Sequence, residues 1–176
     1  MLEGKLVNLR VEEKEDMKLV AEWLNNLDYF GEYNPLMQES RTELEKRYDQ
    51  MPPEMKWFII EKKDGSKVGS VGHFPVGKLL EIGYAIIPSE RGKGYCTEAL
   101  KIMVDYMFLS KDIVRIQAHT DARNKASQKV AEKAGFKKEG TIRKAMFIMG
   151  EWRDLFLYSI LREEWKEPKI LTKTLP

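Results

Sequence analysis

The chain begins with an alternation of apolar and polar positions, in which Val7, Leu9 and Val11 are separated by polar residues. A period of two predicts a strand over residues 5–11. Over residues 12–27 the apolar residues recur at a spacing of three and four, which predicts an amphipathic helix. The next stretch, residues 28–40, contains glycine, asparagine and proline and is predicted to be a loop.

A second helix and a set of strands are predicted next. Thr42 and Glu45 have the spacing of a capping box, which predicts the start of this helix, and Pro52 ends it. Three strand-like runs then follow, at residues 57–60, 68–74 and 79–87. Asp64-Gly65 stands between the first two runs and is typical of a hairpin turn.

The second half of the chain adds a long helix and closing strands. The apolar face of the helix consists of Ala99, Leu100, Met103, Val104, Met107 and Phe108. The later elements are a strand at 114–120, a short helix at 125–134 ended by Gly135, and an antiparallel pair at 141–148 and 155–161. We therefore expect one α/β (α+β) domain with a mixed sheet over residues 1–166, followed by a tail over residues 167–176.

Composition limits the classes of function. The 176 residues include 30 basic and 28 acidic side chains, and a net charge of +2 does not favour nucleic acid as a partner. Cys96 is the only cysteine, which excludes an internal disulfide and a cysteine cage, and no metal is expected. The first residues lack the apolar core of a signal peptide, and no apolar run reaches membrane-spanning length. We expect a cytoplasmic protein without a membrane partner.

A glycine turn between a strand and a helix is the most informative segment. Pro88 closes the strand, and Gly92 and Gly94 allow the backbone to approach a ligand closely. Since a helix N-terminus presents free N–H groups and partial positive charge, such a turn is suited to a pyrophosphate. Thr97 is placed to cap the helix or to donate its hydroxyl to phosphate. The alternative is an ordinary turn with a helix cap.

Two other phosphate-binding motifs are excluded. A P-loop requires a lysine followed by serine or threonine at a fixed distance from its first glycine, and the chain has none in that frame. A Rossmann fingerprint requires a third glycine where this chain has Thr97, and it opens a βαβ unit, whereas this turn follows hairpin-like strands.

At this turn the chain resembles the GNAT family, the GCN5-related N-acetyltransferases. The family signature is matched by Arg91-x-x-Gly94-x-Cys96, with Cys96 in place of the usual glycine or alanine. Asn124-x-x-Ser127 and the later Lys133-x-Gly135-Phe136 are also typical of the family. The segment from residue 152 to 165 resembles the RimJ/RimL-like branch of ribosomal-protein N-terminal acetyltransferases. The resemblance covers roughly residues 4–166.

The resemblance implies a fold and a cosubstrate. The implied fold is a mixed, mostly antiparallel sheet of about seven strands with four helices, in which two central strands splay apart. Acetyl-CoA is expected to lie in the resulting gap, with its pantetheine pairing like an added strand. The residues implied in cofactor binding are Ile86, Ile87, Arg91, Gly92, Lys93, Gly94, Tyr95, Cys96, Thr97, Asn124 and Ser127.

The resemblance also implies a mechanism in which an amine attacks the thioester directly. A backbone N–H near Ile86 or Ile87 is expected to stabilise the oxyanion. Ser127 is the candidate proton donor to the departing thiolate, because no tyrosine occurs between Asn124 and Gly135. Asn124 is expected beside the cofactor arm.

For the general base, the first candidate is Glu81, and Glu151 and Asp154 are weaker candidates. A strand-face carboxylate paired with a lysine is the structural alternative for Glu81. A water relay without a direct base is the other alternative, because an α-amino group is partly neutral at cellular pH.

Several other reactive or aromatic residues are expected to be structural. His73 and His119 lack an acidic partner at triad-like spacing and are expected to be structural or surface groups. A helix N-terminus would lower the pKa of Cys96, but the phosphate site should bury it, so it is not expected to be a nucleophile. Four aromatic residues belong either to the acceptor wall or to the core: Trp23, Tyr29, Phe30 and Tyr33.

The favoured function is therefore acetyl-CoA-dependent N-acetyl transfer to a protein N-terminal amine or a small-molecule amine. One alternative is a non-catalytic acyl-CoA-binding regulator of the same fold. A nucleotide or nucleic-acid binder using Arg91 and Lys93 is the weakest hypothesis, because the charge is balanced. The last strands are a candidate homodimer interface. The sequence does not name the acceptor amine.

Overall fold

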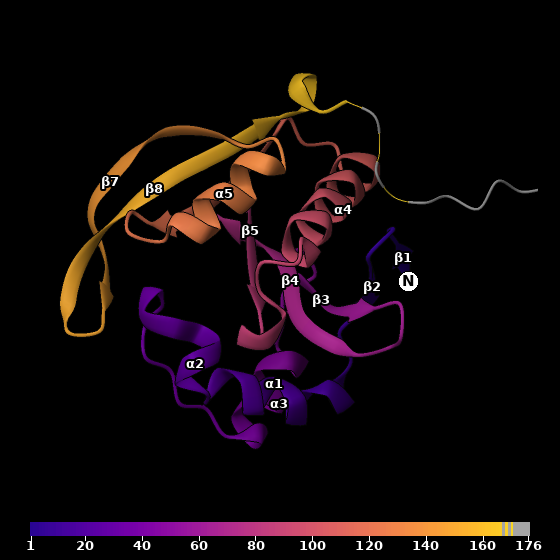
Figure 1. Cartoon of the computed structure of the whole chain (residues 1–176), viewed down its shortest axis with the longest axis vertical. Helices are drawn as coiled ribbons and strands as arrows, with labels where there is room; N and C mark the ends of the chain where they lie inside the picture. The colour runs from indigo at the N-terminus through magenta and orange to yellow at the C-terminus, as the bar shows by residue number, and fades with distance from the viewer. Residues whose placement is uncertain (167, 169, 171–176) are drawn as a thin grey trace, which may run out of the picture.

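The computed structural model describes residues 1–166, 168 and 170, and these form one eight-stranded sheet with helices on both faces (Figure 1). The strands are β1 (Leu2–Glu3), β2 (Val7–Val11), β3 (Lys56–Lys62), β4 (Lys67–Val76), β5 (Leu79–Ile86), β6 (Arg115–Asp121), β7 (Lys137–Ile148) and β8 (Glu151–Leu161). The α-helices are α1 (Met17–Leu24), α2 (Leu27–Phe30), α3 (Arg41–Asp49), α4 (Tyr95–Ser110) and α5 (Lys125–Lys133). Within the described residues, the expected seven strands and four helices are thus exceeded by one each, through the very short β1 and α2.

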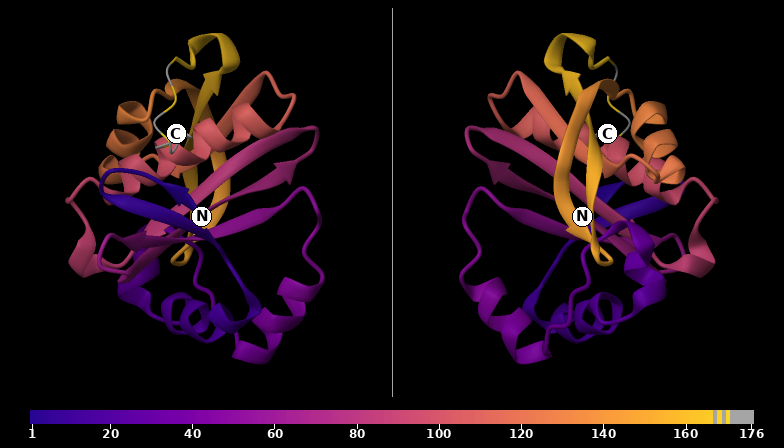
Figure 2. Two further views of the ribbon diagram at one scale, coloured as in Figure 1. Left: turned by 90° about the vertical axis from the view of Figure 1, so that its right-hand side faces the viewer. Right: turned by 90° about the vertical axis from the view of Figure 1, so that its left-hand side faces the viewer.

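The order of strands in the sheet is β1-β2-β3-β4-β5-β6-β8-β7. The helices α4 and α5 lie over one face, and α1, α2 and α3 lie below the other, as the side views also show (Figure 2). The hairpin of β7 and β8 forms a long curved arm at one edge (Figure 1). The predicted apolar face of α4 is confirmed, because all six of its residues are buried in the core.

The predicted splay of the central strands is confirmed at β5 and β6. Within the described residues, their parallel register comprises two pairs, Leu80 with Ile116 and Glu81 with Gln117. Beyond Glu81, β5 remains paired with β4 up to Ile86, while β6 pairs with β8 along its whole length. Two strands that are each held by their other neighbour leave a gap between them.

Local chemistry corrects the predicted boundaries around the first helices. The capping box lies at Ser40 and Glu43 and not at Thr42 and Glu45: the Ser40 N–H donates to Glu43 Oε2 at 2.8 Å, and Ser40 Oγ accepts from the Glu43 N–H at 3.3 Å. Glu45 instead pairs with Arg41 one turn earlier. Serine and glutamate have the same spacing two residues upstream, and the helix begins there.

The predicted helix over residues 12–27 and the loop after it also differ in the structure. A 3-10 turn at Lys14–Asp16 precedes α1, which ends at Leu24. The side chain of Asn26 accepts from the Asp28 N–H at 2.8 Å and starts the short helix α2 inside the predicted loop. A further 3-10 turn, Gly31–Tyr33, follows directly.

The predicted tail lies mostly outside the described residues. None of the described helices is long and apolar enough to cross a membrane. The described residues also contain no group of three or more His, Cys, Asp or Glu side chains arranged to hold a metal ion.

A candidate active site between β5 and β6

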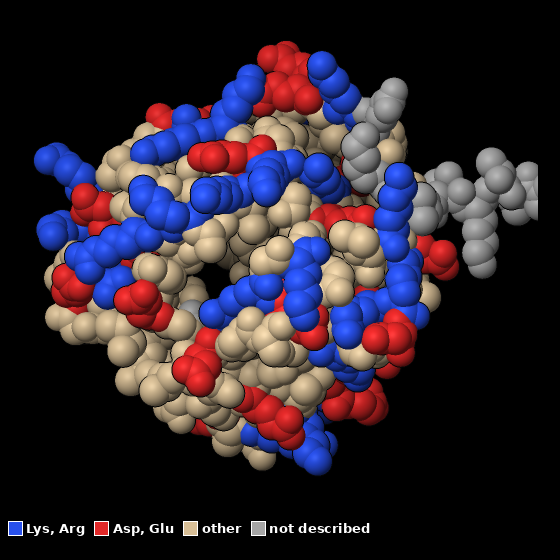
Figure 3. Space-filling view, in the orientation of Figure 1, with Lys and Arg blue, Asp and Glu red and all other residues tan. Residues whose placement is uncertain are grey.

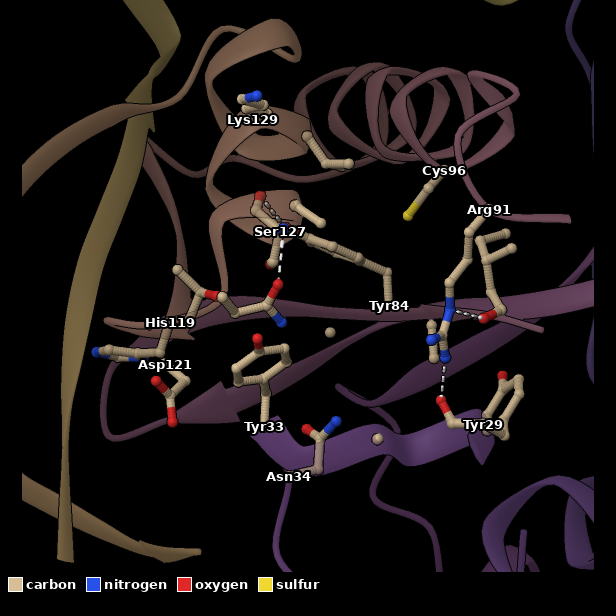
Figure 4. A pocket seen from close by; sticks show the side chains of 18 of the residues that line it. Tyr29, Tyr33, Asn34, Tyr84, Arg91, Cys96, His119, Asp121, Ser127 and Lys129 are labelled. Carbon is tan, nitrogen blue, oxygen red and sulfur yellow. Dashed lines mark hydrogen bonds between the residues drawn. The ribbon is translucent and has the colours of Figure 1, made fainter. Parts of the chain in front are cut away.

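A cavity of about 930 Å³ occupies the gap where β5 and β6 diverge. Its wall at one end is formed by the turn before α4, the first turn of α4 and one side of α5; we call this the turn end. At the other end it is lined by Glu32, Tyr33, Glu81, His119 and Asp121, which we call the carboxylate end. The space-filling view shows the hollow beside α5, and the close-up shows side chains of both ends facing it (Figures 3 and 4).

The turn end presents free backbone amides. Gly92 and Gly94 have φ values of 78° and 88°, a left-handed conformation that favours glycine. Gly94 is the N-cap of α4 and provides no side-chain cap, so Thr97 lies inside the helix and does not cap it. In the part of the chain that the structure describes, the amides of residues 92–97 donate to no protein acceptor. Free amides and the helix dipole make this an anion site.

The side chain of Arg91 holds this turn in place. Its Nε donates to the carbonyl of Ile86 at 3.0 Å, and its Nη2 donates to the carbonyls of Asp28 and Tyr29 at 2.9 and 2.6 Å (Figure 4). The guanidinium therefore joins the end of β5, the turn and α2. Lys93, which the sequence suggested as an added charge, pairs with Glu90 at 3.0 Å and does not line the cavity.

The two candidate oxyanion donors have different positions. The Ile87 N–H donates to the carbonyl of Val68 at 2.9 Å, so it is already bonded to β4, and Ile87 does not line the cavity. Successive N–H groups of a strand point to opposite edges, so the Ile86 N–H points toward β6 and the gap. Of the two predicted residues, Ile86 is the one whose amide can face a thioester.

Ser127 has a phenol partner that the sequence did not reveal. Asn124 caps α5 by accepting from the Ser127 N–H at 3.0 Å, which orients the first turn of that helix. The Ser127 hydroxyl lies 3.0 Å from the hydroxyl of Tyr84, and the two side chains point toward each other (Figure 4). Burial raises the pKa of the Tyr84 phenol, so it keeps its proton at neutral pH.

Glu81 lies at the carboxylate end and is bonded to a histidine. Its Oε2 lies 2.7 Å from Nδ1 of His119 and accepts from Nε2 of Gln117 at 3.2 Å. The sequence showed no acidic partner for His119 at triad-like spacing, and the structure supplies one from a distant segment, since parallel pairing of β5 and β6 brings Glu81 and His119 together. His73, in contrast, is buried on β4 against the ring of Tyr106 and does not line the cavity.

A buried ion pair closes the carboxylate end. Arg153 of β8 lies 3.2 Å from Asp121 of β6, and both side chains are buried. The same Arg153 nitrogen donates to the carbonyl of Glu32 at 2.9 Å. Arg91 and Arg153 therefore bind the segment from α2 to Tyr33 at both ends.

The predicted acceptor-wall residues fall into two groups. Tyr29 and Tyr33 line the cavity. Trp23 does not line it but stacks on Tyr29 with ring centroids 5.3 Å apart, so it supports the wall from behind. The side chain of Phe30 lies outside the described residues.

The two weaker base candidates are excluded from the cavity. Glu151 lies 2.8 Å from Arg123 and 3.2 Å from Arg153, and it is exposed at the tip of the β7–β8 arm. Asp154 accepts from the Lys144 N–H at 2.8 Å. Neither carboxylate lines the cavity.

Cys96 faces the cavity as a neutral thiol. Burial raises its pKa to about 12, so the thiol is protonated at neutral pH. This favours the prediction that Cys96 is not a nucleophile.

Sequence reasoning also missed two lysines of α5. Lys129 and Lys133 line the turn end, one helical turn apart, and basic side chains gather over this helix beside the hollow (Figure 3). The signal was present as lysines at positions 125, 129 and 133, a spacing that places them on one face.

Comparisons with known proteins agree with this geometry. Residues 7–137 match the family model described as an acetyltransferase (GNAT) domain. The probable N-acetyltransferase YjcK of Bacillus subtilis is 33% identical, over 93% of this chain and 98% of its own. The spermidine N(1)-acetyltransferase of Escherichia coli is 27% identical, over 90% of this chain and 88% of its own.

A solved structure shows the same fold. The ribosomal-protein-S5-alanine acetyltransferase of Vibrio fischeri superposes with a TM-score of 0.84 at 24% identity, over 95% of this chain and all of its own. The chain belongs to the GNAT acetyltransferase family and is an N-acetyltransferase that uses acetyl-CoA as cosubstrate.

Proposed function

We propose that acetyl-CoA binds with its pyrophosphate at the turn end, and that a small cationic amine bound at the carboxylate end attacks the thioester directly. The observation that carries this proposal is the pair of unlike ends in one cavity. Free amides and the lysines of α5 stand at one end, and Glu32, Glu81 and Asp121 stand at the other.

The cofactor is held mainly by backbone. Gly92, Gly94, Tyr95, Cys96 and Thr97 supply amides or line the wall around the pyrophosphate. Arg91 acts through its contacts with three carbonyls and keeps this backbone in place. The edge of β5 at Ile86 is open toward the gap, so the pantetheine can add to it as an extra strand.

The reaction needs three functions from the chain. The Ile86 N–H stabilises the oxyanion that forms when the amine adds to the carbonyl carbon. As the C–S bond breaks, the thiolate takes a proton from the hydroxyl pair of Ser127 and Tyr84. Asn124 acts indirectly, because it caps α5 and thereby orients Ser127. Glu81 takes part, together with its neighbouring side chains, in removing the proton of the amine.

The charge of the carboxylate end favours a cationic acceptor. Asp121 is neutralised by Arg153, which leaves Glu32 and Glu81 as the carboxylates that face a bound ammonium group. A related protein is a spermidine acetyltransferase, and a polyamine has this chemistry. A peptide N-terminus is the other acceptor considered, and it would have to enter the same end.

The experiment is a turnover assay with matched acceptors. We expect acetyl-CoA consumption with spermidine and spermine to exceed that with short peptides by at least about tenfold in kcat/KM, as expected when two carboxylates recognise a polycation. Peptide acetylation at the higher rate would overturn the acceptor class. Binding of CoA without turnover of any amine would favour the non-catalytic regulator.

A further inference from the structure

We infer that His119 is the catalytic base that takes the proton of the amine, and that Glu81 is its positioning partner. This inference rests on the proposed function and assigns a role within the same site. Both residues line the cavity at its carboxylate end, and His119 is the only histidine that does so in the described part of the chain. Whether His119 can accept a proton depends on the tautomer of its imidazole.

The contacts of Glu81 determine that tautomer. Its Oε2 accepts from the amide nitrogen of Gln117 at 3.2 Å and lies 2.7 Å from Nδ1 of His119. An ionised carboxylate only accepts hydrogen bonds, so the imidazole nitrogen that faces it, Nδ1, must carry a proton. In the neutral ring Nε2 then carries a lone pair, and the one side-chain hydrogen bond of His119 to a described residue is made by Nδ1.

The sheet explains why these groups meet. Glu81 and Gln117 are register partners in the short parallel contact of β5 and β6, and His119 follows Gln117 on the same face of β6. The contact lies at the point where the strands separate. The imidazole therefore stands at the entrance to the gap that we assign to the thioester.

The charged neighbours of His119 come from four elements. Glu81 faces it from β5, Glu32 and Tyr33 come from the turn after α2, and Asp121 lies two residues further on the same face of β6. Arg153 of β8 is paired with Asp121. Asp121 is also bonded to the Arg123 N–H at 2.7 Å, so it is engaged at both oxygens and is a poor candidate for the base.

The proton transfers balance with His119 in this role. The bound ammonium gives one proton to Nε2 and becomes a neutral amine, and the imidazolium is stabilised by the Glu81 carboxylate. The amine nitrogen then bonds to the carbonyl carbon, the C–S bond breaks, and the thiolate takes a proton from the hydroxyl pair of Ser127 and Tyr84. That pair regains its proton from the second N–H of the amine through solvent, and the imidazolium releases its proton to water.

An imidazole suits this step better than a carboxylate. The ordinary pKa of an imidazole is nearer to the pH of the cell than that of a carboxylate, and a base is most effective when its pKa is near the operating pH. The pairing of an imidazole with a buried carboxylate is the arrangement that orients the base in the serine-hydrolase triad.

The kinetic test compares His119→Gln with Glu81→Gln over the full pH range. We expect His119→Gln to lower kcat by about 10²–10³-fold and to abolish the fall in activity at low pH, as for the loss of a general base. Glu81→Gln should lower kcat by only about tenfold and keep that fall, since the imidazole remains. His73→Gln is the matched control, and its pH profile should follow that of the unchanged protein.

A second readout reports the tautomer itself. Nitrogen-15 NMR of the free protein should show His119 protonated at Nδ1 and unprotonated at Nε2, with the signals assigned by their absence in His119→Gln. The inference is overturned by an Nε2-protonated ring, by a low-pH limb that survives in His119→Gln, or by a kcat within about threefold of the unchanged protein. CoA titration of each variant separates these results from a failure of the proposed function, in which the unchanged protein itself would not bind CoA.

Discussion

The hydroxyls of Tyr84 and Ser127 lie 3.0 Å apart across the gap between β5 and α5. The serine is held by the Asn124 cap, and the tyrosine comes from the opposite wall of the cavity. The phenol is buried and protonated at neutral pH, because burial raises its pKa. A protonated phenol beside a serine hydroxyl supports our proposal that this pair gives a proton to the departing thiolate.

Removing the Tyr84 hydroxyl should slow the chemistry without weakening the cofactor. Tyr84→Phe is expected to lower kcat by about 10²-fold, because general-acid catalysis is lost, while the Kd for CoA stays within about threefold. Steady-state kinetics and calorimetry measure the two quantities. Tyr48→Phe, which removes a hydroxyl bonded to the Glu12 carbonyl outside the cavity, is the control and should leave kcat unchanged. A Tyr84→Phe variant with normal kcat would exclude the phenol as the donor.

The guanidinium of Arg91 should affect the binding of both substrates. It bonds to the end of β5 and to two carbonyls of α2, which belong to the cofactor side and the acceptor side. Arg91→Lys keeps the charge but loses the fork that reaches several acceptors, so KM for acetyl-CoA and for the amine should each rise by about tenfold. Arg41→Lys, at an exposed pair with Glu45, is the control. An increase in KM for only one of the two substrates would contradict a role of Arg91 in both binding sites.

Glu12 should make the stability of the fold decrease as the pH rises. Burial, reinforced by the charge of Asp16, raises the pKa of Glu12 from 4.5 to about 7. Between pH 4.5 and about 7 the folded protein therefore keeps a proton on Glu12 that the unfolded chain has released. The contribution of this proton to the free energy of unfolding is full below that range and is lost as the pH rises through it. The change corresponds to roughly 1–3 kcal/mol.

Glu12→Gln should remove this contribution. Urea unfolding at about pH 5 and about pH 8 should show a smaller difference in the free energy of unfolding for the variant than for the unchanged protein. Glu15→Gln, an exposed residue of the neighbouring turn, serves as the comparison. If the free energy of unfolding changed equally with pH in Glu12→Gln and in the unchanged protein, ionisation of Glu12 would not destabilise the fold.

Much of the fold could be predicted because its signals are local. The apolar face of α4 repeats at helical spacing, and Asp64-Gly65 is a turn sequence, with Gly65 at a φ of 84°. Glycine at the end of α5 was also a local signal, and Gly135 has a φ of 98°. Where the prediction failed locally, two patterns competed: Ser40 with Glu43 and Thr42 with Glu45 have the same spacing, and the sequence does not rank them.

The site was predicted on its backbone side and incompletely on its side-chain side. The glycine turn is continuous in sequence, so its position at the start of α4 could be expected. Glu81 and His119 are separated by 38 residues, and Tyr84 and Ser127 by 43. The first pair meets because β5 and β6 are neighbours, and the second because α5, which follows β6, lies across the gap from β5. Neighbour relations between strands depend on the crossover through α4, which no local pattern reports.

The proposed function requires CoA to bind to the amides before α4, and two glycines allow a matched test of this binding. Gly92 and Gly65 both have a left-handed φ, 78° and 84°, and an added Cβ meets nothing within 4 Å at either position. Alanine should therefore strain both turns alike, whereas we propose that CoA binds only against Gly92. Calorimetry should show the Kd for CoA increased by at least about tenfold in Gly92→Ala and unchanged in Gly65→Ala. Equal Kd values for CoA in the two variants would contradict binding of CoA at the turn before α4.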